Sequence, residues 1–217
     1  MMIAIVPVTP FQQNCSLVWD QASGHGSVVD PGGDVPRILA EAARLNITVD
    51  SIVLTHGHID HAGGAAELQE ALRARAGTTD GVPIIGPDAR DRFLLQSLVT
   101  QGAAFGIAAR DVLPDRWLSE GDAIPLAGAT FDILHCPGYT PGSVVLVNRA
   151  ARFALVGDVL FRGSVGRTDF PYGDGAALVE AITTKLLPLG DDMQFICGHG
   201  PGSTIGLERR TNPYLTA

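Results

Sequence analysis

Four residues of metal-binding type stand within six positions of this chain, and this cluster restricts its fold more than any other feature. Residues 55–61 read Thr-His-Gly-His-Ile-Asp-His, in direct continuation of a short apolar run that begins at Ser51. Imidazole and carboxylate groups are the ligands that Zn²⁺ and similar divalent ions prefer. In α/β proteins, sites form in loops where a buried strand ends and a helix begins. The segment therefore predicts an α/β fold with a metal-binding loop at the end of a buried strand.

The spacing inside this loop predicts ligands for two ions. Gly57 allows the backbone to curl, so that His56 and His58 can point at one ion. Asp60 and His61 can then point at a second ion. A single histidine in a loop is ordinary, whereas three histidines and one aspartate at this spacing are typical of a metal site.

Two later loops follow short apolar strands in the same way. Asp158 follows the run 153–156, and His199 stands in the glycine-rich segment 197–202 after the last predicted strand. Each residue alone has an ordinary explanation, as a turn carboxylate or a surface imidazole. Because three loops at strand ends can converge, we expect Asp158 and His199 to complete a two-metal site.

Hydrophobic periodicity along the chain predicts alternating strands and helices. Asp34 is placed to cap a first helix, with Pro36 in its first turn. Strands come before helices in each half, which predicts a sandwich of two sheets with helices outside, folded as one domain over residues 1–217. Residues 101–120 show no regular pattern. The predicted strands are 3–8, 16–19, 26–29, 51–55, 82–85, a run from 124, 130–134, 144–147, 153–156 and 194–197, and the predicted helices are 34–45, 62–75, 88–100 and 174–187.

Composition excludes several classes of function. A formal charge of −8 disfavours a nucleic-acid partner, which needs a basic surface. No apolar run approaches the roughly 20 residues that span a membrane. The first 13 residues lack the basic start of a signal peptide, so we expect a cytoplasmic protein with no membrane partner. The three cysteines, Cys15, Cys136 and Cys197, are widely spaced and are expected to be buried, reduced thiols.

The ordered set His56, His58, Asp60, His61, Asp158 and His199 resembles the metallo-β-lactamase superfamily, and in particular its short bacterial glyoxalase II-like hydrolases. The resemblance implies an αββα sandwich of two mixed sheets, with helices on the outer faces and the metals at one edge. It also implies that the chain lacks the additional C-terminal helical domain of full-length glyoxalase II. Further matching stretches cover nearly the whole chain: 6–9, 13–16, 29–33, 115–118, 135–138, 165–171 and 186–192.

The same resemblance implies the ligands and the reaction. The first metal takes His56, His58 and a third histidine from the segment that begins at His135. The second metal takes Asp60, His61 and His199, and Asp158 bridges the two ions. Zinc is the expected metal, with iron or manganese as alternatives. Asp60 and Asp158 thereby act in catalysis, in which a hydroxide shared by the metals attacks a thioester such as S-lactoylglutathione and releases a hydroxy acid and a thiol.

One ligand position departs from the family pattern. Residues 135–142 read His-Cys-Pro-Gly-Tyr-Thr-Pro-Gly, so Tyr139 stands where the family has its third histidine. Three arrangements are open: Tyr139 ligates as a phenolate, the first site is weak or empty while the second fills, or His135 replaces the missing ligand. A neutral phenol is a poor ligand, because its pKa is near 10. We therefore expect an impaired hydrolase.

Alternative functions stay open beside thioester hydrolysis. The same fold could act on a lactone, on a β-lactam, or on glutathione persulfide with a single iron. A metal-impaired member could instead bind a metabolite without converting it.

Several residues near the motifs have two interpretations. Asp30 either supports a metal-bound histidine or bonds to its own turn. Arg167 either holds an anionic group of the substrate or forms a structural ion pair. Tyr172 and Phe170 either line a substrate pocket or pack in the core, and His25 is expected to be exposed.

Overall fold

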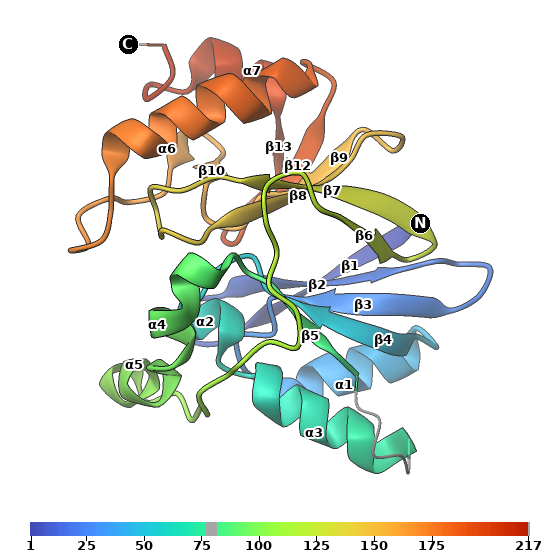
Figure 1. Cartoon of the computed structure of the whole chain (residues 1–217). Coiled ribbons are helices and arrows are strands. Elements are labelled where there is room, and N and C mark those ends of the chain that lie inside the picture. The colour runs from blue at the N-terminus through green and yellow to red at the C-terminus, as the bar shows by residue number, and fades with distance from the viewer. Residues whose placement is uncertain (77–81, 217) are drawn as a thin grey trace.

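Two β-sheets lie face to face in the computed structural model, which describes residues 1–76 and 82–216 (Figure 1). Helices α1 and α3 cover the outer face of the first sheet, and α6 and α7 cover the outer face of the second (Figure 1). Helices α2, α4 and α5 lie together at one edge of the sandwich (Figure 1). This arrangement confirms the predicted αββα layering.

The first sheet has five strands in the order β1-β2-β3-β4-β5 and is mixed, because β3, β4 and β5 are parallel while β1 and β2 are antiparallel. Neighbouring residues on its central strands face different layers. Leu17 packs beneath the sheet among the residues that contact the helices, whereas Val18 packs between the two sheets. Both faces are therefore apolar. The strands are β1 (Met2–Val8), β2 (Gln13–Trp19), β3 (His25–Val29), β4 (Thr48–Val53) and β5 (Ile84–Ile85).

The second sheet has six strands in the order β13-β12-β9-β8-β7-β6 and is also mixed, since β12 and β9 are parallel. Leu146 on β8 packs between the sheets, and its neighbours Val145 and Val147 pack toward α6. The strands are β6 (Ala123–Leu126), β7 (Ala129–His135), β8 (Val144–Asn148), β9 (Phe153–Leu155), β12 (Gln194–Ile196) and β13 (Ser203–Thr204), and a separate hairpin is formed by β10 (Leu160–Phe161) and β11 (Ser164–Val165).

The helices are short, and each buries one apolar face. Helix α1 buries Val35, Ile38, Leu39 and Ala42, which recur at the spacing of one helical face. Helix α6 is continued by a π-helical turn, Ile182–Leu186, and a 3₁₀ turn, Leu187–Leu189. The helices are α1 (Val35–Arg44), α2 (Ile59–Ala62), α3 (Ala65–Ala76), α4 (Arg92–Leu95), α5 (Leu98–Phe105), α6 (Gly175–Ala181) and α7 (Ile205–Thr211).

The predicted helix 62–75 is wrong at its start. The chain forms α2 first, breaks at Gly63 and Gly64, and then forms α3. The Gly64 amide donates to the Pro31 carbonyl at 2.8 Å, and a Cβ on Gly64 would lie 2.7 Å from that oxygen. The glycine pair thus lets the metal-binding loop pack against the turn after β3, which hydrophobic periodicity does not reveal.

The predicted helix 88–100 is also divided. A 3₁₀ turn over Ala89–Asp91 precedes α4, and α5 begins only at Leu98 and extends into the region predicted to be irregular. The break at Ser97 is stabilised by its own hydroxyl, which donates to the Leu94 carbonyl at 3.0 Å.

Asp34 differs from its predicted role as a helix cap. It has a positive φ of 50° and makes no side-chain capping bond. Its carboxylate instead accepts from the Thr9 amide at 2.7 Å, which ties the β1–β2 turn to the start of α1. Asp174 does cap its helix, by accepting from the Ala177 amide at 3.0 Å.

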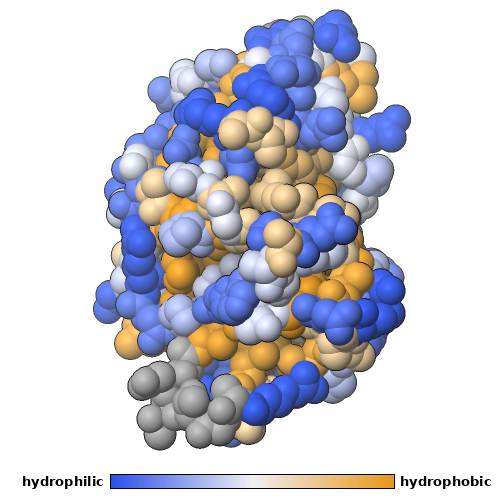
Figure 2. Space-filling model, turned by 90° about the vertical axis from the view of Figure 1, so that its right-hand side faces the viewer, coloured by the Kyte–Doolittle hydropathy of each residue, from blue (hydrophilic) through white to orange (hydrophobic). Residues whose placement is uncertain are grey.

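Figure 2 views the edge of the sandwich opposite α2, α4 and α5, and hydrophilic side chains are spread over this whole face with hydrophobic ones visible between them. All three cysteines are free and buried, as predicted. No helix within the described ranges is long and apolar enough to cross a membrane.

Candidate metal centre

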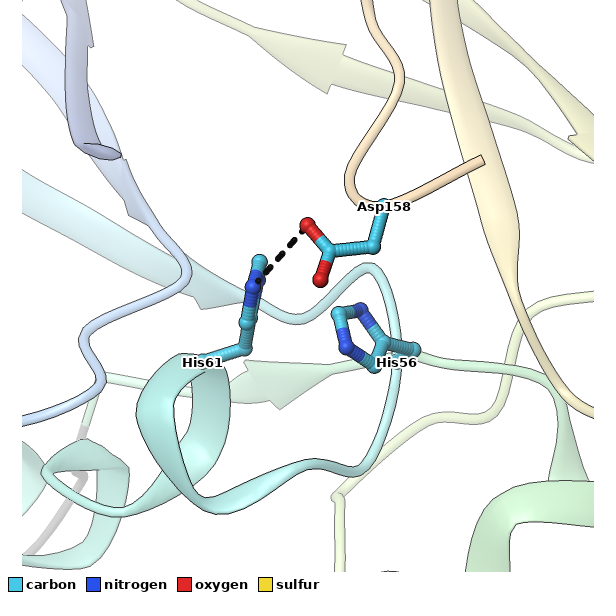
Figure 3. A group of neighbouring side chains, drawn as sticks. All are labelled: His56, His61 and Asp158. Carbon is cyan, nitrogen blue, oxygen red and sulfur yellow. Dashed lines mark ion pairs between the residues drawn. The ribbon is translucent and has the colours of Figure 1, made fainter. Parts of the chain in front are cut away.

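Loops at strand ends converge at one edge of the sandwich, as the sequence predicts. His56 and His61 come from the segment after β4, with His61 in α2, and Asp158 comes from the loop after β9. Figure 3 shows these three side chains pointing toward one another, with Asp158 Oδ1 3.3 Å from His61 Nε2. All three residues are buried, and their ligand atoms lie within 4.8 Å of one another.

A second group shares His61 with the first. Asp60, His61 and His199 also bring their ligand atoms within 4.8 Å of one another. The Nε2 atom of His199 lies 3.1 Å from Asp60 Oδ2 and 3.7 Å from Asp158 Oδ2. Asp158 therefore directs one oxygen toward His61 and the other toward His199, both of which are predicted ligands of the second metal. Its role as a bridge between two ions stays a prediction.

Thr55 and Asp30 fix the orientation of His56. The Thr55 hydroxyl donates to Asp30 Oδ2 at 2.7 Å and lies 3.0 Å from His56 Nδ1. Burial holds the pKa of His56 well below its usual range, so the ring is neutral. Because the Thr55 proton is engaged with Asp30, the network assigns the ring proton to Nδ1. The lone pair on Nε2 is then free to face the centre.

Asp30 also orients His61. Its Oδ2 atom lies 2.9 Å from His61 Nδ1, and the Gln13 amide nitrogen lies 3.4 Å from the same ring atom. Burial acts to lower the pKa of His61, but the carboxylates of Asp158, Asp30 and Asp60 together raise it well above its usual range. Asp30 therefore supports a predicted metal ligand, which was one of its two interpretations.

The buried polar atoms of the centre fit a divalent cation. His56 Nε2, His61 Nε2 and Asp158 Oδ1 are buried and have no hydrogen-bond partner among the residues described. Burying a polar atom without a hydrogen-bond partner destabilises the folded state. Imidazole nitrogens and carboxylate oxygens are common metal ligands, so a bound cation would satisfy all three atoms. A Cβ on Gly198 would lie 2.0 Å from Asp158 Oδ1, so the chain needs glycine where the last loop passes the centre.

His58 is engaged differently from the other predicted ligands, and it belongs to neither group of three. Its Nδ1 atom lies 3.0 Å from the Tyr139 hydroxyl, and its Nε2 atom lies 2.9 Å from the Tyr172 hydroxyl. Burial lowers the pKa of His58 to about 4, so this ring is neutral. Each of its nitrogens therefore has a tyrosine partner.

Tyr139 is a protonated phenol in contact with His58. Burial, reinforced by the Asp158 and Asp60 carboxylates, raises the pKa of Tyr139 far above its usual range, so the phenol keeps its proton. Its hydroxyl lies 3.0 Å from His58 Nδ1, within hydrogen-bond distance. This contact occupies the His58 nitrogen that faces Tyr139.

His135 lies in a different environment from the metal centre. Its Nε2 atom lies 2.8 Å from the Pro141 carbonyl and 3.5 Å from an Arg90 nitrogen, and it contacts none of the predicted ligands among the residues described. The arrangement in which His135 replaces the missing ligand therefore has no support in the structure.

Sequence reasoning missed two residues that hold the loops in place. Asp91 is buried and accepts from Gly57 N at 2.9 Å, Thr140 Oγ1 at 2.7 Å and Gly142 N at 2.6 Å, so it joins the histidine loop to the loop of Tyr139. Asn14 donates to the carbonyls of Cys197 and Gly200, both at 2.9 Å, and so holds the loop of His199. Their partners are far away in sequence, so no local pattern identifies them.

A cavity of about 810 Å³ opens beside the centre, and His58, Asp60, Asp158 and His199 line it. Tyr172 and Phe170 line the same cavity, in agreement with one of their two interpretations. Arg167 lines it too, but it forms an ion pair with Asp169, with two N–O distances of 2.6 Å.

Comparison with known proteins agrees with this geometry. Residues 8–199 match the family described as the Metallo-beta-lactamase superfamily. The chain belongs to this superfamily. It is 45% identical to a Haemophilus influenzae protein named hydroxyacylglutathione hydrolase GloC, with 100% of this chain and 99% of that protein covered.

Two solved structures share the fold over their whole length. A B3 metallo-beta-lactamase named BLEG-1 superposes with a TM-score of 0.86 at 32% identity, covering 100% of both chains. A di-iron-bound form of TTHA1623 superposes with a TM-score of 0.85 at 37% identity, covering 98% of this chain and 100% of that one. Membership of this superfamily implies that the chain binds divalent metal, whereas the di-iron relative leaves open which metal it binds.

Proposed function

We propose that the protein is a metal-dependent hydrolase of thioesters of the S-lactoylglutathione type. The observation that carries this proposal is the convergence of three buried, unpartnered ligand atoms, on His56, His61 and Asp158, beside a cavity of substrate size. The H. influenzae relative named hydroxyacylglutathione hydrolase supports the choice of substrate class.

We infer that His61, Asp60, His199 and Asp158 hold one divalent ion, with zinc as the expected metal and iron or manganese as alternatives. When bound, such an ion polarises a carbonyl group and lowers the pKa of water. His56 offers a further lone pair within 4.8 Å of the ligand atoms of His61 and Asp158. The family position of a second ion would use His58, whose Nδ1 is already engaged by the Tyr139 hydroxyl at 3.0 Å.

The side chains of the cavity supply the remaining requirements of hydrolysis. Water adds to the thioester carbonyl carbon, the carbon–sulfur bond breaks, and the thiol leaves with a proton. His61 and the other histidines hold the pKa of Asp158 well below its usual range although burial raises it, so this carboxylate is ionised and can orient the attacking water. Asp60 is ionised as well, because His61 and His199 lower its pKa against the effect of burial.

Tyr139 reduces the activity in this proposal by occupying the first metal position. Tyr139 is 7% exposed, and its hydroxyl lies 3.0 Å from His58 Nδ1. A histidine in its place could offer a ring nitrogen and free His58 Nδ1. Elemental analysis of Tyr139→His should therefore show more metal per chain than the unchanged protein, with faster thioester hydrolysis. Tyr214→His, at a tyrosine that is 55% exposed, is the matched control and should show no gain.

The test of the function is the hydrolysis of S-lactoylglutathione by the metal-loaded protein, with a β-lactam, a lactone and glutathione persulfide as competing substrates. We expect the thioester to be the preferred substrate and chelation to abolish its turnover. A preference for another substrate would replace the proposed function. Equal metal content in Tyr139→His and the unchanged protein would refute the role of Tyr139.

A further inference from the structure

The wall of the cavity beside the metal centre is aromatic. Five of the eight phenylalanines of the chain line it, although they come from distant segments. Within the described part of the chain, no two of these rings share a strand or helix, so their assembly is a property of the site. They are Phe11, Phe93, Phe105, Phe161 and Phe170.

Three of these rings are exposed at the mouth of the cavity. Phe11 is 41% exposed, Phe93 is 46% exposed, and Phe105 is 55% exposed. Phe11 precedes β2 and Phe105 ends α5, yet their ring centroids lie 5.1 Å apart in an edge-to-face pair. Contiguous exposed apolar surface of this kind marks a binding site.

The inner wall continues the same surface to the metal centre. The rings of Phe170 and Tyr172 are stacked with centroids 5.3 Å apart, and Phe93 packs edge-on to Tyr172 at the same separation. Tyr172 in turn reaches His58. An apolar path therefore runs from the mouth of the cavity to the predicted ligands.

The charges that face the cavity disfavour an anionic group on the acyl part of the substrate. Arg167 is the one arginine or lysine among the residues described as lining it, and two of its guanidinium nitrogens are engaged by Asp169. The Arg167 guanidinium also lies 4.6 Å from the centroid of the Phe170 ring. A carboxylate placed in this cavity would meet no unpaired cation among these lining residues.

We propose that this aromatic cavity binds an uncharged apolar acyl group, so that the preferred substrates are thioesters with an aryl or medium-length alkyl chain. This inference rests on the proposed function, because it assigns the acyl side of the same reaction. The reacting carbonyl would lie at the metal centre, with the hydrocarbon chain extending along Tyr172 and Phe170 toward the exposed rings. Apolar contact area rather than ionic contacts then sets the specificity.

The test uses metal-loaded protein and thioesters of N-acetylcysteamine, a small uncharged thiol, so that only the acyl group varies. We expect kcat/KM to rise from acetyl through butanoyl to octanoyl and phenylacetyl, by up to about fourfold for each buried methylene. The succinyl thioester, which carries a carboxylate, should fall at least tenfold below butanoyl. Equal rates across the series, or a preference for succinyl, would overturn the inference.

A variant at the mouth of the cavity tests whether the exposed rings contact the acyl chain. Phe105→Ser should lower the ratio of kcat/KM for octanoyl to that for acetyl at least fivefold. Leu113→Ser is the matched control, since Leu113 is 64% exposed and does not line the cavity. It should leave the ratio unchanged. An unchanged ratio in Phe105→Ser as well would show that the chain does not follow the exposed rings.

Binding of unreactive thioethers separates this inference from the proposed function. N-acetylcysteamine S-octyl thioether should bind at least tenfold more tightly than its S-ethyl counterpart, as measured by calorimetry. If this preference is found and no thioester is hydrolysed, the apolar cavity stands and the proposed reaction fails. If thioesters are hydrolysed but the two thioethers bind equally, the reaction stands and the acyl assignment fails.

Discussion

Replacing Asp91 with asparagine isolates the effect of one buried charge on the loops of the metal centre. The Asp91 carboxylate is fully buried and accepts three hydrogen bonds, from Gly57, Thr140 and Gly142. Burial nevertheless raises the pKa of Asp91 from 3.8 to about 6, against the lowering effect of these bonds. The fold therefore binds a proton at Asp91 more tightly than the unfolded chain does.

The sign and size of the effect follow from this difference in pKa. The stabilisation from the protonated carboxyl is fully present below about pH 4 and is lost as the pH rises through about 6. A difference of about two pH units corresponds to about 3 kcal/mol at 1.36 kcal/mol per unit. The Asp91→Asn side chain keeps the shape of the carboxylate but does not titrate. The NH₂ group of the new side chain faces a hydrogen-bond donor instead of accepting a bond. This unfavourable contact lowers the free energy of unfolding by about 1–3 kcal/mol at every pH.

Urea unfolding of both proteins at several values between pH 4 and pH 7, in the presence of a chelator, measures this difference. Relative to Asp91→Asn, the unchanged protein should lose about 3 kcal/mol of unfolding free energy over that range. The exposed Asp111→Asn is the control and should run parallel to the unchanged protein. A constant difference between Asp91→Asn and the unchanged protein at every pH would refute the reasoning.

Three further predictions concern the metal centre. Asp30→Asn removes the carboxylate partner of His61 and should weaken zinc affinity about 10- to 100-fold, as measured by competition with a chelator. The control Asp50→Asn alters the partner of the exposed His25 and should leave zinc affinity unchanged. In Gly198→Ala, the new Cβ would overlap Asp158 Oδ1, so elemental analysis should show lost metal and unfolding should show a cost of about 1–3 kcal/mol. The control Gly200→Ala has open space around its Cβ but a φ of +72°, so it should lose stability through backbone strain and still retain metal. Protein in chelator should have a free energy of unfolding about 2.7 kcal/mol lower than protein in free metal at a hundred times its dissociation constant. An equal melting temperature with and without chelator would contradict the proposed centre.

The sequence predicted the layered fold and the placement of the candidate ligands because both depend on local patterns. Apolar runs determine the strands, and His56, His61, Asp158 and His199 each follow or begin an element at a short, fixed spacing. The break at Gly63 and Gly64 was missed, because its cause is a contact with the turn after β3.

The remaining features depend on contacts between distant residues. Asp91 lies 34 positions from Gly57 and 51 from Gly142, so its role exists only in the folded chain. The aromatic cavity brings Phe11 beside Phe105 in the same way. The resemblance identified Tyr139 as unusual, but only its contact with His58 shows what its hydroxyl does.

The bonds of Asn14 to the loop of His199 span 183 and 186 positions of the chain. During synthesis, these bonds can therefore form only after almost the whole polypeptide has been made, so the candidate metal centre is completed late. The candidate ligands come from both sheets, through the loops after β4, β9 and β12. A bound ion would thus link the two sheets of the sandwich. Its loss would lower the cooperativity of unfolding of the whole domain rather than free one loop.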